Sequence, residues 1–473
     1  MPGQRLSRLS PVSDFEPGSV PQGRPAENLA EVEDALLSRW PETRLEPSLD
    51  RIEDFVDLLG QPQRNYDVVQ LTGTNGKTST ARMVETLLRG LGLRTGRFTS
   101  PHLETIRERI VIDGEPLSED AFVSAFNDIA PYTHLVDAQN EHPLSFFETV
   151  VGMSYAAFSD APVDVAVVEV GMGGTWDATN VADARVAVLT PIGLDHAQYL
   201  GSTVEAVARE KVGIIKHNAV VVSAPQTQTV LDVIQERVDH VGATLLLAGR
   251  DFWLESRVPA VGGQQVTLHG LRAAYDELFL PLYGAHQAEN AVLALAAVEA
   301  LIGGEEAIAG DVVQEAFEQV TSPGRLEIIR RSPTIVLDAA HNPHGAQALV
   351  DALEDSFTFS PLIGVVGVMG DKDYEEMLSI LEPRLAHIVC TQNSTERALP
   401  ARQLAEVARG IFGIDRVSEA PSLIDAIDEA AALAEAGGVF GESLGSGGVL
   451  VTGSVITVGE ARAMLKSRRE DSI

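Results

Sequence analysis

The residues best suited to chemistry lie in segment 72–79, TGTNGKTS, which follows the apolar run 68–71. A glycine-rich turn between a strand and a helix lets backbone N–H groups converge on phosphate oxygens, and a lysine such as Lys77 reaches the outer phosphates. Leu71 stands where the full Walker pattern has glycine, so the loop is a shortened variant. A tight turn with an incidental lysine is the alternative, but the required strand and helix patterns flank the loop. The segment predicts a nucleoside triphosphate site. The loop residues expected at the phosphates and Mg²⁺ are Asn75, Gly76, Lys77 and Thr78.

A carboxylate and an imidazole follow two further apolar runs. Glu169 ends the run 163–168, where an ionised side chain is costly unless it is paired or bound to a metal. Glycines two to five residues beyond it allow the backbone to approach a ligand closely. His196 follows the run 186–190. Taken alone, Glu169 could be a solvated strand-end residue and His196 a packing residue, so these two residues leave a metal site open.

Short apolar runs separated by helical patterns would position these residues. The runs are rich in β-branched residues, are mostly followed soon by Gly, Asn, Asp or His, and lie at 68–71, 163–170, 186–190, 219–223, 334–337, 362–368, 387–391 and 448–452. Helical spacing marks, among others, 28–40, 51–59, 79–90, 288–301 and 374–381. Unalternated runs of this kind are typical of strands buried on both faces, so we predict an α/β fold with a mostly parallel sheet. Ligands of such sheets bind beyond the carboxyl ends of the strands, where the polar residues cluster.

The chain is expected to divide into a leader and two domains. Residues 1–27 contain 12 Pro, Gly or Ser and are predicted to be disordered or loosely attached. Residues 250–283 lack helical signals and predict an antiparallel patch. The turn cluster SPGR at 322–325 precedes a strand, so we place an N-terminal ATP-binding domain at 28–322 and a C-terminal α/β domain at 323–473. The Gly- and Ser-rich segment 436–448 is expected to be a surface loop.

The bulk properties argue against several classes of protein. The 473 residues carry 35 Lys and Arg against 68 Asp and Glu, a formal net charge of −33, which opposes binding to nucleic acid or an anionic membrane. The single cysteine, Cys390, excludes an intramolecular disulfide and a multi-cysteine zinc site, and we expect it in the core. No apolar stretch is long enough to span a membrane, and the first residues show no signal-peptide core. These features favour a cytoplasmic protein without nucleic-acid or membrane partners.

Several motifs together resemble one enzyme family. The loop GTNGKT at 73–78 is similar to that of the Mur-ligase superfamily, whose members make amide bonds with ATP. Further motifs resemble folylpolyglutamate synthase and dihydrofolate synthase of the actinobacterial type: TSPHL at 99–103, EVGMGG at 169–174, DATN at 177–180, DH at 195–196, REK at 209–211 and DAAHNP at 338–343. The resemblance implies a two-domain fold, an N-terminal P-loop ATPase domain followed by a smaller Rossmann-like domain that binds glutamate.

The same resemblance implies metal ligands. Three residues align with ligands of Mg²⁺: Ser100, Glu169 and His196. The lysine matching Lys211 is carbamylated by CO₂ in the relatives, which turns a cation into an anion that can serve a second metal. Read without the family, Lys211 would lie on a solvated helix face.

Residues of both domains are implied in ATP binding and catalysis. Beyond the loop, the residues aligned with ATP contacts are Asn290, Arg325 and Asp338. The residues expected to act in catalysis are Lys77, Lys211 and His341, with His341 near the acyl phosphate and the incoming glutamate. Segments 367–373 and 452–459 would line the same cleft.

The implied reaction joins L-glutamate to a folate through an acyl phosphate made with ATP. Residues matching segments that hold dihydropteroate in bifunctional relatives are Phe147, Glu148, Asp177 and Ala178, so we expect both synthase activities. Phe146 or Phe147 could equally belong to the core. Thr175 stands where many relatives have arginine, so the guanidinium of those relatives is missing here.

The expected partners are small molecules, namely folates, dihydropteroate and L-glutamate, and the enzyme is expected to be a monomer. A peptidoglycan Mur ligase is the alternative within the superfamily, against which TSPHL and EVGMGG argue. A P-loop switch that hydrolyses nucleotide leaves the cluster at 338–341 unexplained. A non-catalytic nucleotide-binding module would tolerate the loss of Glu169.

Overall fold

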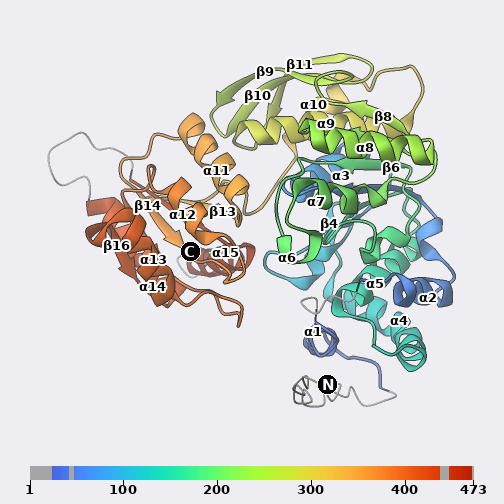
Figure 1. Cartoon of the computed structure of the whole chain (residues 1–473), viewed down its shortest axis with the longest axis horizontal. Helices are drawn as coiled ribbons and strands as arrows, with labels where there is room; N and C mark the ends of the chain where they lie inside the picture. Colours follow the sequence, from blue (N-terminus) through green and yellow to red (C-terminus); the bar gives the residue numbers. More distant parts are fainter. Residues whose placement is uncertain (1–23, 42–46, 437–446, 471–473) are drawn as a thin grey trace, which may run out of the picture.

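The structure is a computed structural model that describes residues 24–41, 47–436 and 447–470. Two lobes lie side by side, one formed by the N-terminal part of the chain and one by the orange-to-red C-terminal part (Figure 1). Most of the predicted leader and of the predicted loop at 436–448 lies outside the described residues. Within the leader, Ala26 exchanges two hydrogen bonds with Asn127, from its N–H to Oδ1 at 2.8 Å and from Nδ2 to its carbonyl at 2.9 Å.

The largest sheet has the strand order β4-β3-β2-β5-β1-β6-β7-β8. Its strands are β1 (Asp67–Thr72), β2 (Thr95–Phe98), β3 (Ile110–Ile112), β4 (Glu115–Pro116), β5 (Val165–Glu169), β6 (Val186–Leu189), β7 (Val220–Ser223) and β8 (Thr244–Leu247). Six of them, from β2 to β8 in that order, run parallel, while β3 and β4 are antiparallel additions at one edge. The valine-rich strand β5 is buried along its whole length, as expected for a sheet covered on both faces.

Helices cover both faces of this sheet. One face, which includes Val69 and Leu71, packs against α3 (Lys77–Gly90) and α9 (Ala285–Ile302). The other face, which includes Val68, packs against a second set of helices. That set is α1 (Leu29–Leu37), α2 (Asp50–Leu58), α4 (Glu119–Gln139), α5 (Phe146–Asp160), α7 (Val204–Lys211) and α8 (Gln228–Val241), with the short α6 (Ala197–Leu200) before α7.

The antiparallel patch predicted at 250–283 is confirmed as a separate sheet of β9 (Trp253–Ala260), β10 (Gly263–His269) and β11 (Ala274–Leu280). Helices α9 and α10 (Gly310–Glu318) pack against it, and Val266 and Leu268 share a core with α3. The patch thereby extends the N-terminal lobe above α9 (Figure 1).

The C-terminal lobe contains a six-stranded sheet with the order β12-β13-β17-β14-β15-β16. Its strands are β12 (Glu327–Arg331), β13 (Thr334–Asp338), β14 (Leu362–Val366), β15 (His387–Cys390), β16 (Val417–Glu419) and β17 (Gly448–Thr452), of which only β12 is antiparallel to its neighbour. The helices α11 (Pro343–Ser356), α12 (Tyr374–Leu381) and α13 (Ala401–Phe412) cover one face, and α14 (Leu423–Ala436) and α15 (Val455–Glu470) cover the other. Cys390 is fully buried, as predicted.

The predicted α/β fold is confirmed, and the differences lie at element ends. The first helix ends at Leu37 rather than at Trp40, because the Trp40 carbonyl accepts the Phe146 N–H at 2.9 Å. Proline at position 41 also disfavours a helical conformation of the residue before it. The boundary predicted at 322/323 falls between α10 and β12.

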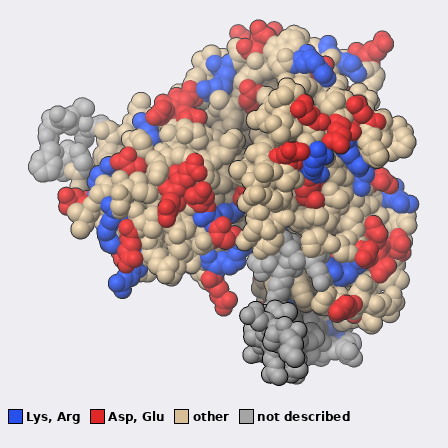
Figure 2. Space-filling model, viewed as in Figure 1, with Lys and Arg blue, Asp and Glu red and all other residues tan. Residues whose placement is uncertain are grey.

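The surface carries both signs of charge. Figure 2 shows acidic side chains scattered over both lobes, with basic side chains among them on this face. None of the described helices is long and apolar enough to cross a membrane.

Candidate active site

The predicted site residues all line a cleft made of two adjoining cavities. The first, of about 570 Å³, is bordered by the phosphate loop and by residues of the C-terminal lobe. The second, of about 420 Å³, reaches from the first towards α2 and α5. The residues that border both are Ser100, Pro101, Gly171, Met172, His196, His341 and Val455. One end of the cleft is therefore suited to a nucleotide and the other to a second substrate.

The phosphate loop joins β1 to α3 in a conformation that its glycines permit. Gly76 is the N-cap before α3, with φ +88°, and a Cβ at that position would lie 2.8 Å from Oδ1 of Asn290. A Cβ at Gly73 would lie 1.8 Å from Oγ1 of Thr190. Lys77 folds over the loop and donates to the carbonyls of Gly73 at 3.1 Å and Thr74 at 3.4 Å. The loop is thus held tightly against the strand and helix behind it.

Glu169 is buried at the end of β5 and faces this loop. Its two carboxylate oxygens each accept from Oγ1 of Thr78 at 2.9 Å. Burial raises the pKa of Glu169, while the charge of Lys77, the Thr78 bond and the Ser100 backbone N–H oppose that rise.

A buried carboxylate beside a hydroxyl is a hard-oxygen donor set of the kind that Mg²⁺ binds, so the residues present fit this ion. The described residues contain no group of three or more His, Cys, Asp and Glu that could hold a metal by themselves. A metal here would need the Thr78 or Ser100 hydroxyls, phosphate oxygens or a modified Lys211.

Lys211 is buried at the end of α7, so it does not lie on a solvated helix face. Its Nζ donates to the Gly73 carbonyl at 2.8 Å. Burial, followed by the positive charge of Lys77, lowers the pKa of Lys211 to about 7. A substantial fraction of this amine is therefore neutral and nucleophilic at neutral pH.

His196 follows β6 and borders the same cavity as Glu169. Its backbone is left-handed, with φ +51°, and its own N–H donates to Oδ1 of Asp195 at 2.8 Å. Burial, with the charge of Lys372 next, lowers the pKa of His196 to about 4. The neutral imidazole is the form that can bind a metal.

The C-terminal lobe contributes Asp338, His341 and Arg325. Asp338 is buried and accepts the backbone N–H groups of Ala340 at 2.9 Å and Leu326 at 3.0 Å. Burial raises its pKa, and the charge of Arg325 opposes that rise. Nδ1 of His341 lies 2.9 Å from the Ala339 carbonyl, which can only accept, so Nδ1 carries the proton and Nε2 is left as an acceptor. Burial lowers the pKa of His341 to about 4.

Asn290 reaches the same cavity from the first turns of α9. Its Nδ2 donates to Oε1 of Gln287 at 3.3 Å, and Gln287 in turn donates to Oγ of Ser79 at 3.4 Å. The amide therefore lies beside the phosphate loop, within a buried polar cluster.

At the other end of the cleft, both predicted carboxylates have partners within the protein. Glu148 closes a capping box at the start of α5, accepting the Ser145 N–H at 2.7 Å, and pairs with Arg51 at 3.1 Å. Asp177 accepts the backbone N–H groups of Met172 at 2.9 Å and Thr179 at 3.0 Å. Burial raises the pKa of Asp177. Glu148 and Asp177 therefore stabilise the backbone around the cavity and also line it.

The structure separates the two adjacent phenylalanines. Phe146 is buried, with the guanidinium of Arg109 4.9 Å from its ring centre. Phe147 borders the cavity, as does Ala178, and meets Phe98 edge-on with ring centres 5.9 Å apart. Thr175, in the position of the relatives' arginine, donates to the Glu210 carbonyl at 3.0 Å, while the following Trp176 borders the cavity.

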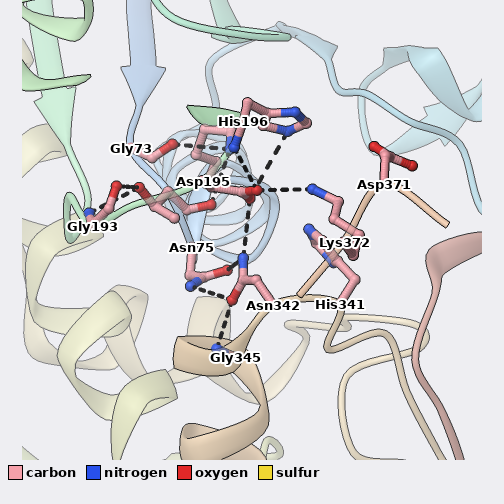
Figure 3. A network of polar contacts seen from close by, with 12 residues as sticks. Gly73, Asn75, Gly193, Asp195, His196, His341, Asn342, Gly345, Asp371 and Lys372 are labelled. Atoms are coloured by element: carbon pink, nitrogen blue, oxygen red, sulfur yellow. Dashed lines mark hydrogen bonds and ion pairs between the residues drawn. The ribbon is translucent and has the colours of Figure 1, made fainter. Parts of the chain in front are cut away.

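Several cleft residues were not assigned chemistry from the sequence. His102 accepts a hydrogen bond from Nε of Arg109 at Nδ1, at 3.0 Å, and borders the second cavity. Lys372, in the predicted cleft segment 367–373, pairs with Asp195 at 2.8 Å. Asn342 donates to the same aspartate at 3.1 Å, so residues of both lobes meet at Asp195 (Figure 3). The sequence motifs DH at 195–196 and HNP at 341–343 contain two of these residues, Asp195 and Asn342. Only the fold shows that the two motifs contact each other.

Family models match both parts of the chain, residues 71–298 as the Mur ligase middle domain and 324–455 as the Mur ligase glutamate ligase domain. The fold and the site thus define a Mur ligase. The chain is 46% identical to the dihydrofolate synthase/folylpolyglutamate synthase of Mycobacterium tuberculosis, over 96% of this chain and 97% of that protein. It therefore belongs to the dihydrofolate synthase/folylpolyglutamate synthase family.

Two solved structures are similar over most of the chain. The M. tuberculosis folylpolyglutamate synthase complexed with ADP has a TM-score of 0.89 and 47% identity, covering 92% of this chain and 98% of that one. The Escherichia coli FolC complex with DHPP and ADP has a TM-score of 0.81 and 28% identity, covering 95% of this chain and all of that one. The predicted fold class and enzyme class are confirmed, whereas the roles of individual residues remain predictions.

Proposed function

We propose that this chain is an ATP-dependent ligase that adds L-glutamate to folates and to dihydropteroate. The observation that carries this proposal is the cleft in which a phosphate loop and an aromatic-lined cavity meet at Ser100, His196 and His341. The relatives named for both synthase activities support the same conclusion. The cleft is large enough for two substrates held end to end.

The reaction has two steps. The acceptor's carboxylate oxygen attacks the γ-phosphorus of ATP, the bond to the β-phosphate oxygen breaks, and an acyl phosphate and ADP form. The amine of glutamate then attacks the acyl carbon, an amide bond forms, and phosphate leaves with the electron pair of the broken C–O bond. ATP is needed because a carboxylate oxygen is a poor leaving group and phosphate is a good one.

The protein's own groups suit these steps. Lys77 can move from the loop carbonyls to phosphate oxygens and offset the charge of the transferring group. Arg325 of the C-terminal lobe and Asn290 of α9 both border the nucleotide cavity. Nε2 of His341, which is neutral and unprotonated, can accept the proton that the attacking amine loses.

Mg²⁺ would be held by Ser100, Glu169 and His196, and it would offset negative charge at the triphosphate when bound. Lys211 is proposed to react with CO₂, its neutral amine forming a C–N bond and releasing one proton to give a carbamate. The buried amine with a pKa lowered to about 7 supports this step. A carbamate could serve a second metal, whereas an ammonium ion would repel it.

The acceptor is proposed to lie along Phe147, Asp177 and Ala178, with the pterin ring against the aromatic side chain. A folate tail and dihydropteroate would present a carboxylate to the same reacting point, at different distances from the ring. The enzyme is further proposed to act as a cytoplasmic monomer, without nucleic-acid or membrane partners.

The test is glutamate incorporation and ADP release with dihydropteroate and, separately, with a reduced monoglutamyl folate. Both acceptors are expected to give amide product and one ADP per glutamate. Activity on the folate alone would remove the dihydrofolate synthase role, and activity on dihydropteroate alone would remove tail extension. Turnover of ATP without any acceptor would favour a nucleotide-driven switch, and use of a peptidoglycan precursor would favour a Mur ligase of cell-wall synthesis.

A further inference from the structure

One polar junction joins the phosphate loop to the C-terminal lobe, and Asn342 is at its centre (Figure 3). Asn342 is 3% exposed and precedes the first residue of α11. Its amide exchanges two hydrogen bonds with the amide of Asn75 in the loop, both at 3.2 Å. Its Nδ2 also donates to Oδ2 of Asp195 at 3.1 Å. One side chain thus holds two separate segments of the N-terminal lobe.

Asp195 receives donors from both lobes. Its Oδ1 accepts from Nζ of Lys372 at 2.8 Å and from the His196 backbone N–H at 2.8 Å. The side chains of Asp195 and Lys372 are each 11% exposed, so water screens this ion pair less than an exposed one. Approach of the C-terminal lobe is therefore coupled to the backbone of His196.

The amide of Asn342 has a second, separable task. Its Oδ1 accepts the Gly345 N–H at 2.7 Å and so caps α11. The cap needs only an acceptor oxygen, whereas the bond to Asp195 needs the Nδ2 donor. A carboxylate at position 342 would keep the cap and lose the donor.

We propose that Asn342 is a positioning residue that fixes the start of α11, and with it the adjacent His341, against the phosphate loop. The acyl phosphate forms at the loop, and the second step needs His341 and glutamate, which the C-terminal lobe brings. A displacement of about 1 Å between reacting groups can lower a rate about 100-fold. Asn342 therefore couples formation of the acyl phosphate to its capture by the amine. This inference rests on the proposed function.

The test compares Asn342→Asp, Asp195→Asn and the exchanged pair carrying both substitutions. In Asn342→Asp, two carboxylates face one another where a hydrogen bond stood, so the lobes separate. We expect its kcat for glutamate ligation to fall about 10-fold or more and its ADP released per glutamate ligated to rise above one, because the acyl phosphate is lost to water. The exchanged pair restores one donor and one acceptor, and we expect it to regain most of the lost rate.

Two measurements separate positioning from helix capping. Thermal unfolding of Asn342→Asp is expected to stay close to that of wild type, because the cap is kept, while Asn342→Ala loses both the cap and the junction. Small-angle scattering of the ADP complex is expected to give a larger radius of gyration for Asn342→Asp than for wild type. A wild-type ADP-to-glutamate ratio in Asn342→Asp would overturn the inference, as would rate losses that simply multiply in the exchanged pair. If the wild-type enzyme itself ligates no glutamate, the proposed function fails instead.

Discussion

At the scale of single residues, the half-buried Lys77 and the buried Lys211 share one carbonyl. Nζ of Lys77 and Nζ of Lys211 both donate to Gly73, at 3.1 and 2.8 Å. Burial lowers the pKa of both, and the charge of Lys77 lowers the pKa of Lys211 further. The repulsion between two ammonium groups this close would be reduced by a triphosphate bound at Lys77 and by a loss of positive charge at Lys211.

Lys77→Ala is expected to lower the ligation rate by about 10²–10³-fold or more, because a positive charge that faces the transferring phosphoryl group is lost. The measurement is glutamate incorporation under saturating substrates, with circular dichroism to check the fold. Lys466→Ala, at a half-exposed lysine on α15 that pairs with Glu104 away from the cleft lining, is the matched control and should keep most of the activity. Turnover near that of wild type in Lys77→Ala would contradict the assignment of the phosphate loop.

Lys211→Ala is expected to be inactive, and labelled bicarbonate is expected to give a carbamate carbon resonance that this variant lacks. Carbamate formation needs the neutral amine, so the signal should grow as the pH rises through about 7. A spectrum identical in both proteins would refute the carbamate. A crystal map with unbranched density at Lys211 would do the same.

At the scale of elements, the chemistry depends on how strands pass into helices. The β1–α3 turn can bring its backbone to a phosphate only because Gly73 lies against Thr190 of the neighbouring strand end. The start of α5 is fixed differently, by a capping box in which Glu148 also pairs with Arg51. The β1–α3 turn thus depends on a residue without a side chain, whereas the start of α5 depends on a buried ion pair.

Gly73→Ala is expected to abolish ATP binding or folding, because the new Cβ would lie 1.8 Å from a hydroxyl oxygen and the backbone has φ +153°. Gly410→Ala is the control, since nothing lies within 4 Å of its Cβ position in α13 and alanine favours a helix by about 1 kcal/mol. Isothermal titration with ADP and urea unfolding report the two properties. Unchanged ADP affinity in Gly73→Ala would show that the loop adapts.

Glu148→Ala is expected to destabilise the protein by about 3 kcal/mol, because the largely buried Arg51 loses this charge partner and the Ser145 N–H at the start of α5 loses its acceptor. Glu148→Gln keeps a side chain suited to the capping box and should lose less. Urea unfolding measures both changes. Equal stability of all three proteins would mean that the pair contributes nothing.

At the scale of the whole molecule, the cleft gathers half-buried histidines from both lobes. Burial lowers the pKa of each to about 4, and the four are His102, His196, His286 and His341. Their folded-state pKa lies below the unfolded value, so their contribution to stability is present above about pH 6.5 and is lost as the pH falls towards 4. The raised pKa values of Glu169, Asp177 and Asp338 act in the opposite direction.

A single-residue comparison isolates the histidine contribution. The free energy of unfolding of wild type falls between pH 7 and pH 5, and in His286→Gln this fall is expected to be smaller by about 1–2 kcal/mol. The variant lacks one group that takes up a proton on unfolding. Urea unfolding at the two pH values measures the difference. Parallel pH dependence in both proteins would show that His286 does not carry this linkage.

The sequence alone was sufficient for the fold class and the enzyme class, and it named candidate residues that the fold gathers around one cleft. Unalternated valine-rich runs such as 163–170 can be satisfied only by strands covered on both faces, and GTNGKT between a strand and a helix can hardly serve anything but phosphate. The family motifs along the chain led to the expectation that the second substrate is a folate or dihydropteroate. These features are local, so they can be recognised before the chain folds.

Only the tertiary structure decided matters of burial and distance. It buried Lys211, which sequence alone would leave on a solvated helix, and it separated Phe146 in the core from Phe147 in the cavity. It also brought Asn342 to Asn75, 267 positions apart in the chain, and to Asp195. Burial and such contacts depend on which elements pack together, and no local pattern of residue types encodes that packing.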